Sequence, residues 1–171
     1  MNKYELAVVV NAQIEDEERA AVVDKAKALI DGYFESFPAV KAYMDKSIAK
    51  ARELGYSETL FGRRRQLDDI NSRNGVVRGV AERNAINAPI QGTAADIIKI
   101  AMVNIAARMK AEGLKSKMIL QVHDELVFDA LKSEQDTLTA IVRDCMEHAT
   151  DKLSVPLIAE VDYGQNWVDA H

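Results

Sequence analysis

Three consecutive polar residues carry side chains that could bind a metal ion. His123 and Asp124 separate two apolar, β-type runs at residues 118–122 and 125–128, a pattern that predicts a tight hairpin with Asp124 and Glu125 at its tip. Two adjacent carboxylates can hold a hard divalent cation such as Mg²⁺, which takes its other ligands from water and substrate phosphates. The same residues could also form an ordinary polar turn, because Asp is common in turns.

A second group of polar residues has the spacing of one helix face. Arg83 and Asn87 are four residues apart, and Gln91 extends the same line if the helix continues. One cation and two amides in a row could contact DNA phosphates and the hydrogen-bond acceptors of base edges in a minor groove. Pro89 and Gly92 weaken the expected register of Gln91, and a solvated helix face is the alternative interpretation.

A third signal is a local excess of arginine in an acidic chain. The whole sequence has a formal net charge of −5, yet the cations of residues 61–91 are six arginines against three acids. Arginine binds phosphates through paired hydrogen bonds, so the triplet Arg63, Arg64 and Arg65 is a candidate nucleic-acid-binding loop. These arginines could equally be neutralised by neighbouring acids.

Other kinds of active site are not indicated. The single cysteine, Cys145, excludes an intramolecular disulfide framework and a cysteine-based zinc site. Cys145 and His148 lie three residues apart in a predicted helix, but Cys145 falls on the apolar stripe and is expected in the core. The sequence contains no GxGxxG or GxxxxGK[ST] phosphate-binding loop.

The elements that position these residues follow from hydrophobic periodicity and from turn signals. Two helices are expected to meet at Pro38, the second ending at Gly55, and two others to be separated by Pro89. Thr93 with Asp96 and Ser133 with Asp136 are the expected N-cap pairs. Besides the hairpin, the expected elements are strands at residues 4–11, 56–60 and 157–163 and helices at 15–37, 40–54, 74–88, 93–112 and 133–153.

This order of elements predicts the fold class. Strands and helices do not alternate as βα units, so we expect an α+β fold in which helices pack on a small antiparallel sheet containing the carboxylate-bearing hairpin. The 171 residues, 48% of them hydrophobic and 29% charged, are typical of one ordinary domain, or of a domain with an appendage. No apolar run reaches the roughly 20 residues of a membrane span, and the N-terminus lacks a secretory signal, so a cytoplasmic protein without membrane contact is expected.

Five segments together resemble the C-terminal end of family A DNA polymerases, the bacterial DNA polymerase I type. They are GYFESFP (32–38), TLFGRRR (59–65), AERNAINAPIQGTAAD (81–96), QVHDELVF (121–128) and GQNWVDAH (164–171). The resemblance covers about residues 27–171. It implies part of the palm and fingers of a polymerase, with a DNA template-primer and a dNTP as partners and Mg²⁺ as cofactor.

The resemblance also implies roles for individual residues. Asp124 would be one of the palm carboxylates that hold the catalytic metals, with Glu125 beside it and His123 near the primer end. The residues expected to contact the template-primer are Arg63, Arg64, Arg65, Arg83, Asn87 and Gln91. The implied reaction is two-metal nucleotidyl transfer, in which a primer 3′-hydroxyl attacks the α-phosphate of a dNTP.

The sequence departs from the family pattern in two ways. The family's upstream metal-binding aspartate and its triphosphate-binding fingers helix have no counterpart here, so the chain alone is expected to be inactive. Residues 1–30 instead resemble the start of the sixth protein of the bacterial small ribosomal subunit, which suggests a chimera with domains at 1–30 and 31–171. A non-catalytic nucleic-acid-binding module or engineered scaffold is the alternative function, and the strand at residues 4–11 could pair two copies into a homodimer.

Overall fold

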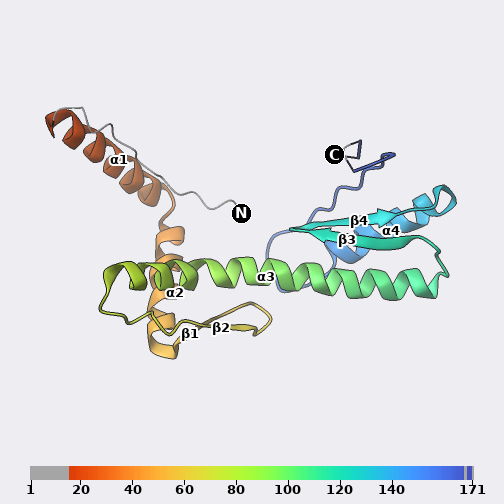
Figure 1. The fold of residues 1–171 in the computed structure, drawn as a ribbon, viewed down its shortest axis with the longest axis horizontal. Coiled ribbons are helices and arrows are strands. Elements are labelled where there is room, and N and C mark those ends of the chain that lie inside the picture. Colours follow the sequence, from red (N-terminus) through yellow and green to blue (C-terminus); the bar gives the residue numbers. More distant parts are fainter. Residues whose placement is uncertain (1–15, 168, 171) are drawn as a thin grey trace. The chain divides into compact units, whose positions relative to one another are not determined.

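The computed structural model describes residues 16–167, 169 and 170, and it divides into two compact units that meet between Lys50 and Ala51 (Figure 1). The first unit holds α1 (Asp16–Ser36) and most of α2 (Pro38–Leu54). Pro38 is the first residue of α2, where its missing N–H costs no helical hydrogen bond. The two predicted helices are therefore confirmed. The predicted strand at residues 4–11, and the homodimer contact through it, lie outside the described residues.

The apolar stripe predicted for α1 exists, but its side chains are largely exposed. Val22, Ile30 and Phe37 are 41%, 43% and 54% exposed. The ring of Tyr33 contacts Phe34 and Phe37, with centroid distances of 5.5 and 5.1 Å. The first unit is thus organised by contacts between neighbours along the chain rather than by a buried core.

The second unit confirms the α+β fold class, with two small antiparallel sheets in place of the single sheet expected. Strands β1 and β2 form one sheet, and β3 and β4 form the other. The elements are β1 (Tyr56–Glu58), β2 (Arg64–Gln66), α3 (Gly75–Ala111), β3 (Lys117–Val122), β4 (Glu125–Asp129), the 3₁₀ helix η1 (Lys132–Glu134) and α4 (Gln135–Glu147).

Helix α3 is continuous through Pro89, so the predicted break at that residue is wrong. Proline cannot donate the hydrogen bond that would normally reach the carbonyl four residues earlier, a penalty of about 3 kcal/mol in a helix interior. Burial on both sides of the proline offsets this cost, because Ala85 before it and Ala101 after it are almost fully buried. Thr93 is not an N-cap; its hydroxyl donates to the Pro89 carbonyl at 2.6 Å.

Two separate cores lie along α3. The first half of the helix buries its apolar face against the end of α2 and the residues that follow β2, in a cluster of Ala51, Leu67, Ile70, Ala81 and Ala85. The second half packs against α4 in a cluster of Ala101, Ile105, Met109, Leu138, Ile141, Val142, Cys145 and Ala149. By length and composition alone α3 could cross a membrane. The core helix of a protein can share those two properties, and α3 places five residues in the two cores, so its length and composition carry no argument for membrane insertion.

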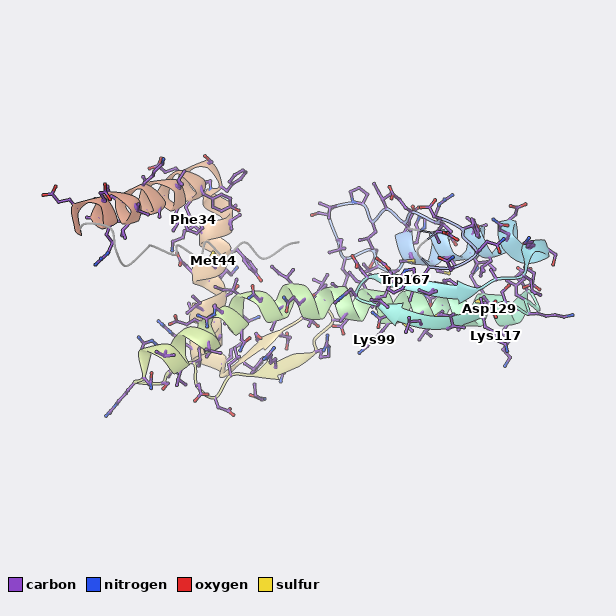
Figure 2. The ribbon with its side chains drawn as sticks, turned by 45° about the horizontal axis from the view of Figure 1, so that its top comes forward. Phe34, Met44, Lys99, Lys117, Asp129 and Trp167 are labelled. Atoms are coloured by element: carbon purple, nitrogen blue, oxygen red, sulfur yellow. The ribbon has the colours of Figure 1, made fainter. Side chains whose placement is uncertain are left out.

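The predicted hairpin is confirmed. Strands β3 and β4 are joined by the two-residue turn His123–Asp124, with Val122 opposite Glu125 at the tip and Lys117 opposite Asp129 at the open end (Figure 2). A register irregularity near Ile119 bends the ladder. One face of the sheet packs on α3 and α4 through residues that include Met118, Leu126 and Phe128.

The C-terminal part of the fold differs from the prediction at two points. Helix α4 begins at Gln135 with no side-chain cap, so the predicted pair of Ser133 and Asp136 is wrong. The carboxylate of Glu134 instead accepts hydrogen bonds from Lys115 N, Ser116 N and Ser116 Oγ at 2.7–3.0 Å, which joins the start of β3 to η1. Residues 157–163 are not a strand, because they have no ladder partner among the described residues.

Candidate nucleic-acid interface

The β1–β2 hairpin is fastened to α3 by one carboxylate. Asp96 Oδ2 accepts the hydroxyl hydrogen of Thr59 at 2.7 Å, and Asp96 Oδ1 accepts from Arg63 Nε at 2.8 Å. Arg63 Nη2 also donates to the carbonyl of Gly92 at 2.8 Å, and Leu60 N donates to Thr93 Oγ1 at 3.0 Å. Arg63 is thus a structural residue that pairs with an acid of the same protein.

Gly92 allows this close approach. A Cβ atom at this position would lie 2.5 Å from Thr59 Cγ2 and 3.3 Å from Arg63 Nη2, well inside ordinary van der Waals contact for the methyl carbon. The glycine that weakened the sequence prediction of a continuous helix is therefore needed for packing between the helix and the hairpin. It does not end the helix.

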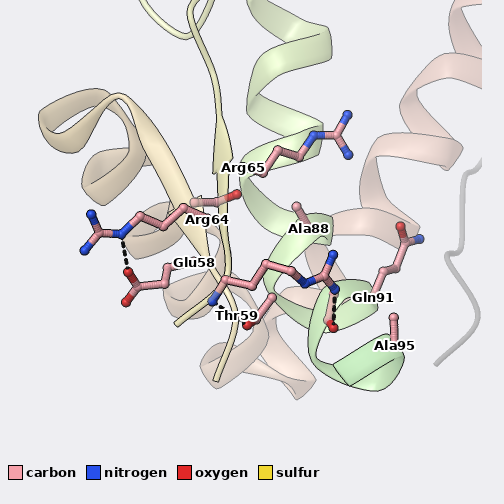
Figure 3. Close-up of a pocket in the computed structure, with 10 residues that line it drawn as sticks. Glu58, Thr59, Arg64, Arg65, Ala88, Gln91 and Ala95 are labelled. Carbon is pink, nitrogen blue, oxygen red and sulfur yellow. Dashed lines mark hydrogen bonds and ion pairs between the residues drawn. The ribbon is translucent and has the colours of Figure 1, made fainter. Parts of the chain in front are cut away.

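The next two arginines point to opposite faces of the β1–β2 sheet, as successive strand residues must. Arg64 lies opposite Glu58, pairs with it at 2.8 Å and stacks over the Tyr56 ring at 4.5 Å. The hydrogen bond that Arg64 donates to the Glu58 carboxylate raises the pKa of Arg64 above its ordinary value. Arg65 lies opposite the buried Ser57, on the face toward α3, and no hydrogen bond or ion pair joins its side chain to a described residue (Figure 3).

A pocket of about 240 Å³ separates this face of the hairpin from α3. Arg65 enters its lining from β2, and Gln91 enters from the helix, with Ala88 and Ala95 on either side (Figure 3). Ser57 also lines it, and the Ser57 hydroxyl is the one buried side-chain polar atom without a partner in the described part of the chain. The pocket thus combines a free cation, an amide and a hydroxyl between small apolar side chains.

The predicted row of Arg83, Asn87 and Gln91 lies on one continuous helix, so Gln91 keeps its register. Each step of four residues turns by about 40°, which spreads the three side chains over one quadrant of the helix surface. Arg83 and Gln91 are exposed and Asn87 is half-buried. Within residues 16–167, the side chain of Arg83 has no hydrogen bond or ion pair, whereas the neighbouring Glu82 is shared by two other arginines.

The six arginines of residues 61–91 therefore divide into two groups. Three are neutralised by acids, as the alternative interpretation held: Arg63 by Asp96, Arg64 by Glu58 and Arg78 by Glu82. The other three are exposed and have no ion pair with a described residue, and they are Arg65, Arg73 and Arg83. This second group has no ion pair with a described residue to give up when it binds a phosphate.

The carboxylate-bearing hairpin tip lies in a different place. His123 and Asp124 are exposed, and His123 has a positive φ of 52°, a conformation that His adopts more readily than most residues. Asp124 and Glu125 line a groove of about 1580 Å³ together with the C-terminal segment around Trp167, whereas Gln91 lines the pocket beside β2. The structure thus brings Asp124 and Glu125 together, but it does not place them in one pocket with the arginine–amide row.

Two residue pairs outside these sites have structural roles. Cys145 is buried in the core of α4, as predicted, and Arg108 donates to its sulfur at 3.7 Å. His148 caps α4 and contacts Asp144, with 3.1 Å between Nδ1 and the carboxylate. Asp144 also pairs with Arg108, so a Cys145–His148 nucleophile pair does not form.

Sequence reasoning missed Thr59, Asp96 and Ser57 as residues of the interface. Asp96 follows Thr93 by three residues, and this spacing predicted a capping pair within one helix. The actual partners of Asp96, Thr59 and Arg63, are 37 and 33 residues away. Nothing in the local pattern marks that contact.

Unpaired arginines beside an amide row, on a fold that also carries two adjacent carboxylates at a hairpin tip, are features of a nucleic-acid-binding protein that handles phosphates. Comparison with known proteins agrees with this class. Residues 11–169 match the model of DNA polymerase family A, and the chain belongs to this family.

Its relatives are bacterial polymerases. The chain is 55% identical over 146 residues to DNA polymerase I of Streptococcus pneumoniae and 50% identical over 146 residues to that of Bacillus subtilis. Each alignment covers 85% of this chain and 16% of the relative, so the chain spans about one-sixth of the relatives' length. The solved POL domain of Pol1 from M. smegmatis, in complex with a DNA primer-template and dNTP, matches 86% of this chain and 26% of its own with a TM-score of 0.83 and 46% identity.

Proposed function

We propose that this chain supplies part of the template-primer-binding surface of a family A DNA polymerase, together with one pair of carboxylates near the reacting groups. The observation that supports this most strongly is the match to a polymerase domain in complex with DNA and dNTP, which covers 86% of this chain. The family match, over residues 11–169, includes both the arginine–amide row and the hairpin. In this role, Arg83 contacts a duplex phosphate, and Asn87 and Gln91 face the minor groove.

The carboxylates supply part of a cation site. Asp124 and Glu125 offer hard oxygen ligands in one groove, which is the donor type that Mg²⁺ prefers. Residues 16–167, 169 and 170 contain no group of three or more His, Cys, Asp or Glu side chains that could hold a metal ion, so these two carboxylates do not form a complete site. A bound divalent cation would neutralise charge on the transferring phosphoryl group.

The chain by itself is expected to bind duplex DNA without extending a primer. It offers the unpaired Arg65, Arg73 and Arg83 to phosphates, but it does not complete a metal site that could orient a triphosphate. This proposal includes the alternative function, a non-catalytic nucleic-acid-binding module, because DNA binding is the activity that we expect of the described residues alone.

Two measurements on the purified chain test the proposal. Fluorescence anisotropy with a labelled primer-template should show binding that weakens steeply as NaCl rises, because bound phosphates release counterions. A primer-extension assay with Mg²⁺ and dNTPs should show no product, while a full-length DNA polymerase I run beside it extends the primer. Absence of binding at low salt would refute the duplex-binding role, and robust extension would refute the inactivity of the chain.

We also propose that residues 1–30 derive from a ribosomal-protein-like segment, as their resemblance suggests, and form a domain separate from residues 31–171. In this proposal the polymerase segment begins at about residue 27, so the two segments join within α1 (Asp16–Ser36), although the family match begins at residue 11. A chain shortened to residues 31–171 tests the separation, because it should fold and bind DNA as the whole chain does.

A further inference from the structure

Asp96 joins α3 to an element that lies far away in sequence, the β1–β2 hairpin. Its side chain is 13% exposed and accepts hydrogen bonds from both Thr59 and Arg63. Thr59 Oγ1 in turn accepts from Arg63 N at 3.1 Å and Phe61 N at 3.3 Å, so the same hydroxyl also shapes the loop between β1 and β2. One carboxylate thereby sets both the conformation of the loop and its attachment to the helix.

The hairpin needs this attachment. Strands β1 and β2 have three residues each, and an isolated two-stranded hairpin is marginally stable in water. All side chains of β2 are exposed, so little apolar burial holds that strand in place. The position of Arg65 relative to Gln91 therefore depends on the polar contacts of the loop with Asp96, Thr93 and the Gly92 carbonyl.

We propose that Asp96 is a positioning residue for DNA binding, which holds the β1–β2 hairpin on α3 so that Arg65 and Gln91 face one pocket and contact the same duplex. This inference rests on the proposed function. It assigns the free cation of the pocket, Arg65, to a backbone phosphate of the DNA, while Arg63 stays paired inside the protein.

The charge of Asp96 makes the inference sharply testable. Replacing an acid near a DNA surface by a neutral residue normally strengthens binding, and Asp96→Ala would also release Arg63. Positioning predicts the opposite result, a weakening of roughly tenfold, as expected when a charge-assisted hydrogen bond is lost. The slope of log K against log[NaCl] should fall by about one, the contribution of a single phosphate contact.

The experiment measures binding of a labelled primer-template by fluorescence anisotropy over a series of NaCl concentrations. Thr59→Val removes the hydroxyl without changing net charge and should weaken binding in the same way as Asp96→Ala. Thr59→Ser keeps the hydroxyl and is the matched control, which should bind like the unmodified chain. Arg65→Ala should weaken binding by a similar factor, and adding Asp96→Ala to it should cost little more, because both changes remove the same contact.

The outcomes separate this inference from the proposed function. If the unmodified chain fails to bind duplex DNA, the proposed function is refuted and Asp96 has nothing to position. If the unmodified chain binds but Asp96→Ala and Thr59→Val bind equally well or more tightly, only the positioning role is refuted. Additive losses in the Arg65→Ala, Asp96→Ala double variant would also refute it, since they would show that Asp96 acts independently of Arg65.

Discussion

Gly92→Ala is the substitution whose effect the structure defines most closely. Alanine is favoured over glycine in a helix interior by about 0.8–1 kcal/mol, so a rule based on helix propensity predicts that the variant is more stable. The new Cβ atom would lie 2.5 Å from Thr59 Cγ2, and overpacking of this kind costs about 1–3 kcal/mol. The balance is a loss of up to about 2 kcal/mol, with no net gain.

Gly79→Ala is the matched control on the same helix. A Cβ atom at residue 79 would meet Arg83 Nη1 at 3.7 Å, an ordinary contact, so this variant should keep the full gain in helix propensity. For a chain of this size, 1 kcal/mol corresponds to a shift of about 2–4 °C in Tm. Thermal unfolding followed by far-UV circular dichroism should therefore show a higher Tm for Gly79→Ala and an unchanged or lower Tm for Gly92→Ala.

A double variant tests the cause of the difference. Thr59→Ser removes the Cγ2 methyl that the new Cβ would meet and keeps the hydroxyl that donates to Asp96. Combining it with Gly92→Ala should recover about 1 kcal/mol or more relative to the sum of the single changes. If Gly92→Ala stabilises the chain as much as Gly79→Ala does, or if Thr59→Ser gives no recovery, the close approach of hairpin and helix does not hold in solution.

Two other predictions concern acid sensitivity and DNA binding. Hydrogen bonds from the Ser116 hydroxyl and from the backbone of Lys115 and Ser116 lower the pKa of Glu134. Glu134 therefore contributes to the free energy of unfolding above the ordinary glutamate pKa, and this contribution is lost as the pH falls through the lowered pKa. Urea denaturation at neutral pH and below about pH 4 should show a smaller loss on acidification for Glu134→Gln, and an unchanged pH dependence would contradict this. Arg83→Ala should weaken duplex binding and lower the slope of log K against log[NaCl] by about one, measured by the same anisotropy titration. Arg64→Ala removes the same charge from a paired arginine and should change the affinity and the slope much less. Equal effects of the two substitutions would show that pairing within the protein does not decide which arginines bind DNA.

Elements defined by neighbouring residues were predictable from the sequence. The His123–Asp124 turn between two β-type runs, the start of α2 at Pro38 and its end before Gly55 all depend on backbone preferences within a few residues. Gly55 has a φ of 76°, a conformation that glycine adopts at little cost. For the same reason the α+β class and the amphipathic α4 followed from periodicity alone.

Where local preference conflicts with packing, the prediction failed. Pro89 has a strong local tendency to end a helix, yet buried residues on both sides keep α3 in one piece. Ser133 and Asp136 have the spacing of a cap, but Glu134 instead binds the backbone at the start of β3. In each case the deciding contact comes from a residue remote in sequence.

By itself, the amino-acid sequence determined which residues are candidates for binding phosphates, base edges or a cation: a row of Arg83, Asn87 and Gln91, an arginine triplet, and two carboxylates at a turn. Only the tertiary structure decided which of them are free to do so. Strand alternation turns Arg64 toward Glu58 and Arg65 toward α3, and Asp96, 33 residues from Arg63, neutralises that arginine. The physical reason is that the type of a side chain is set by its own position, whereas its partner is set by contacts between distant segments, which the order of residues along the chain does not display.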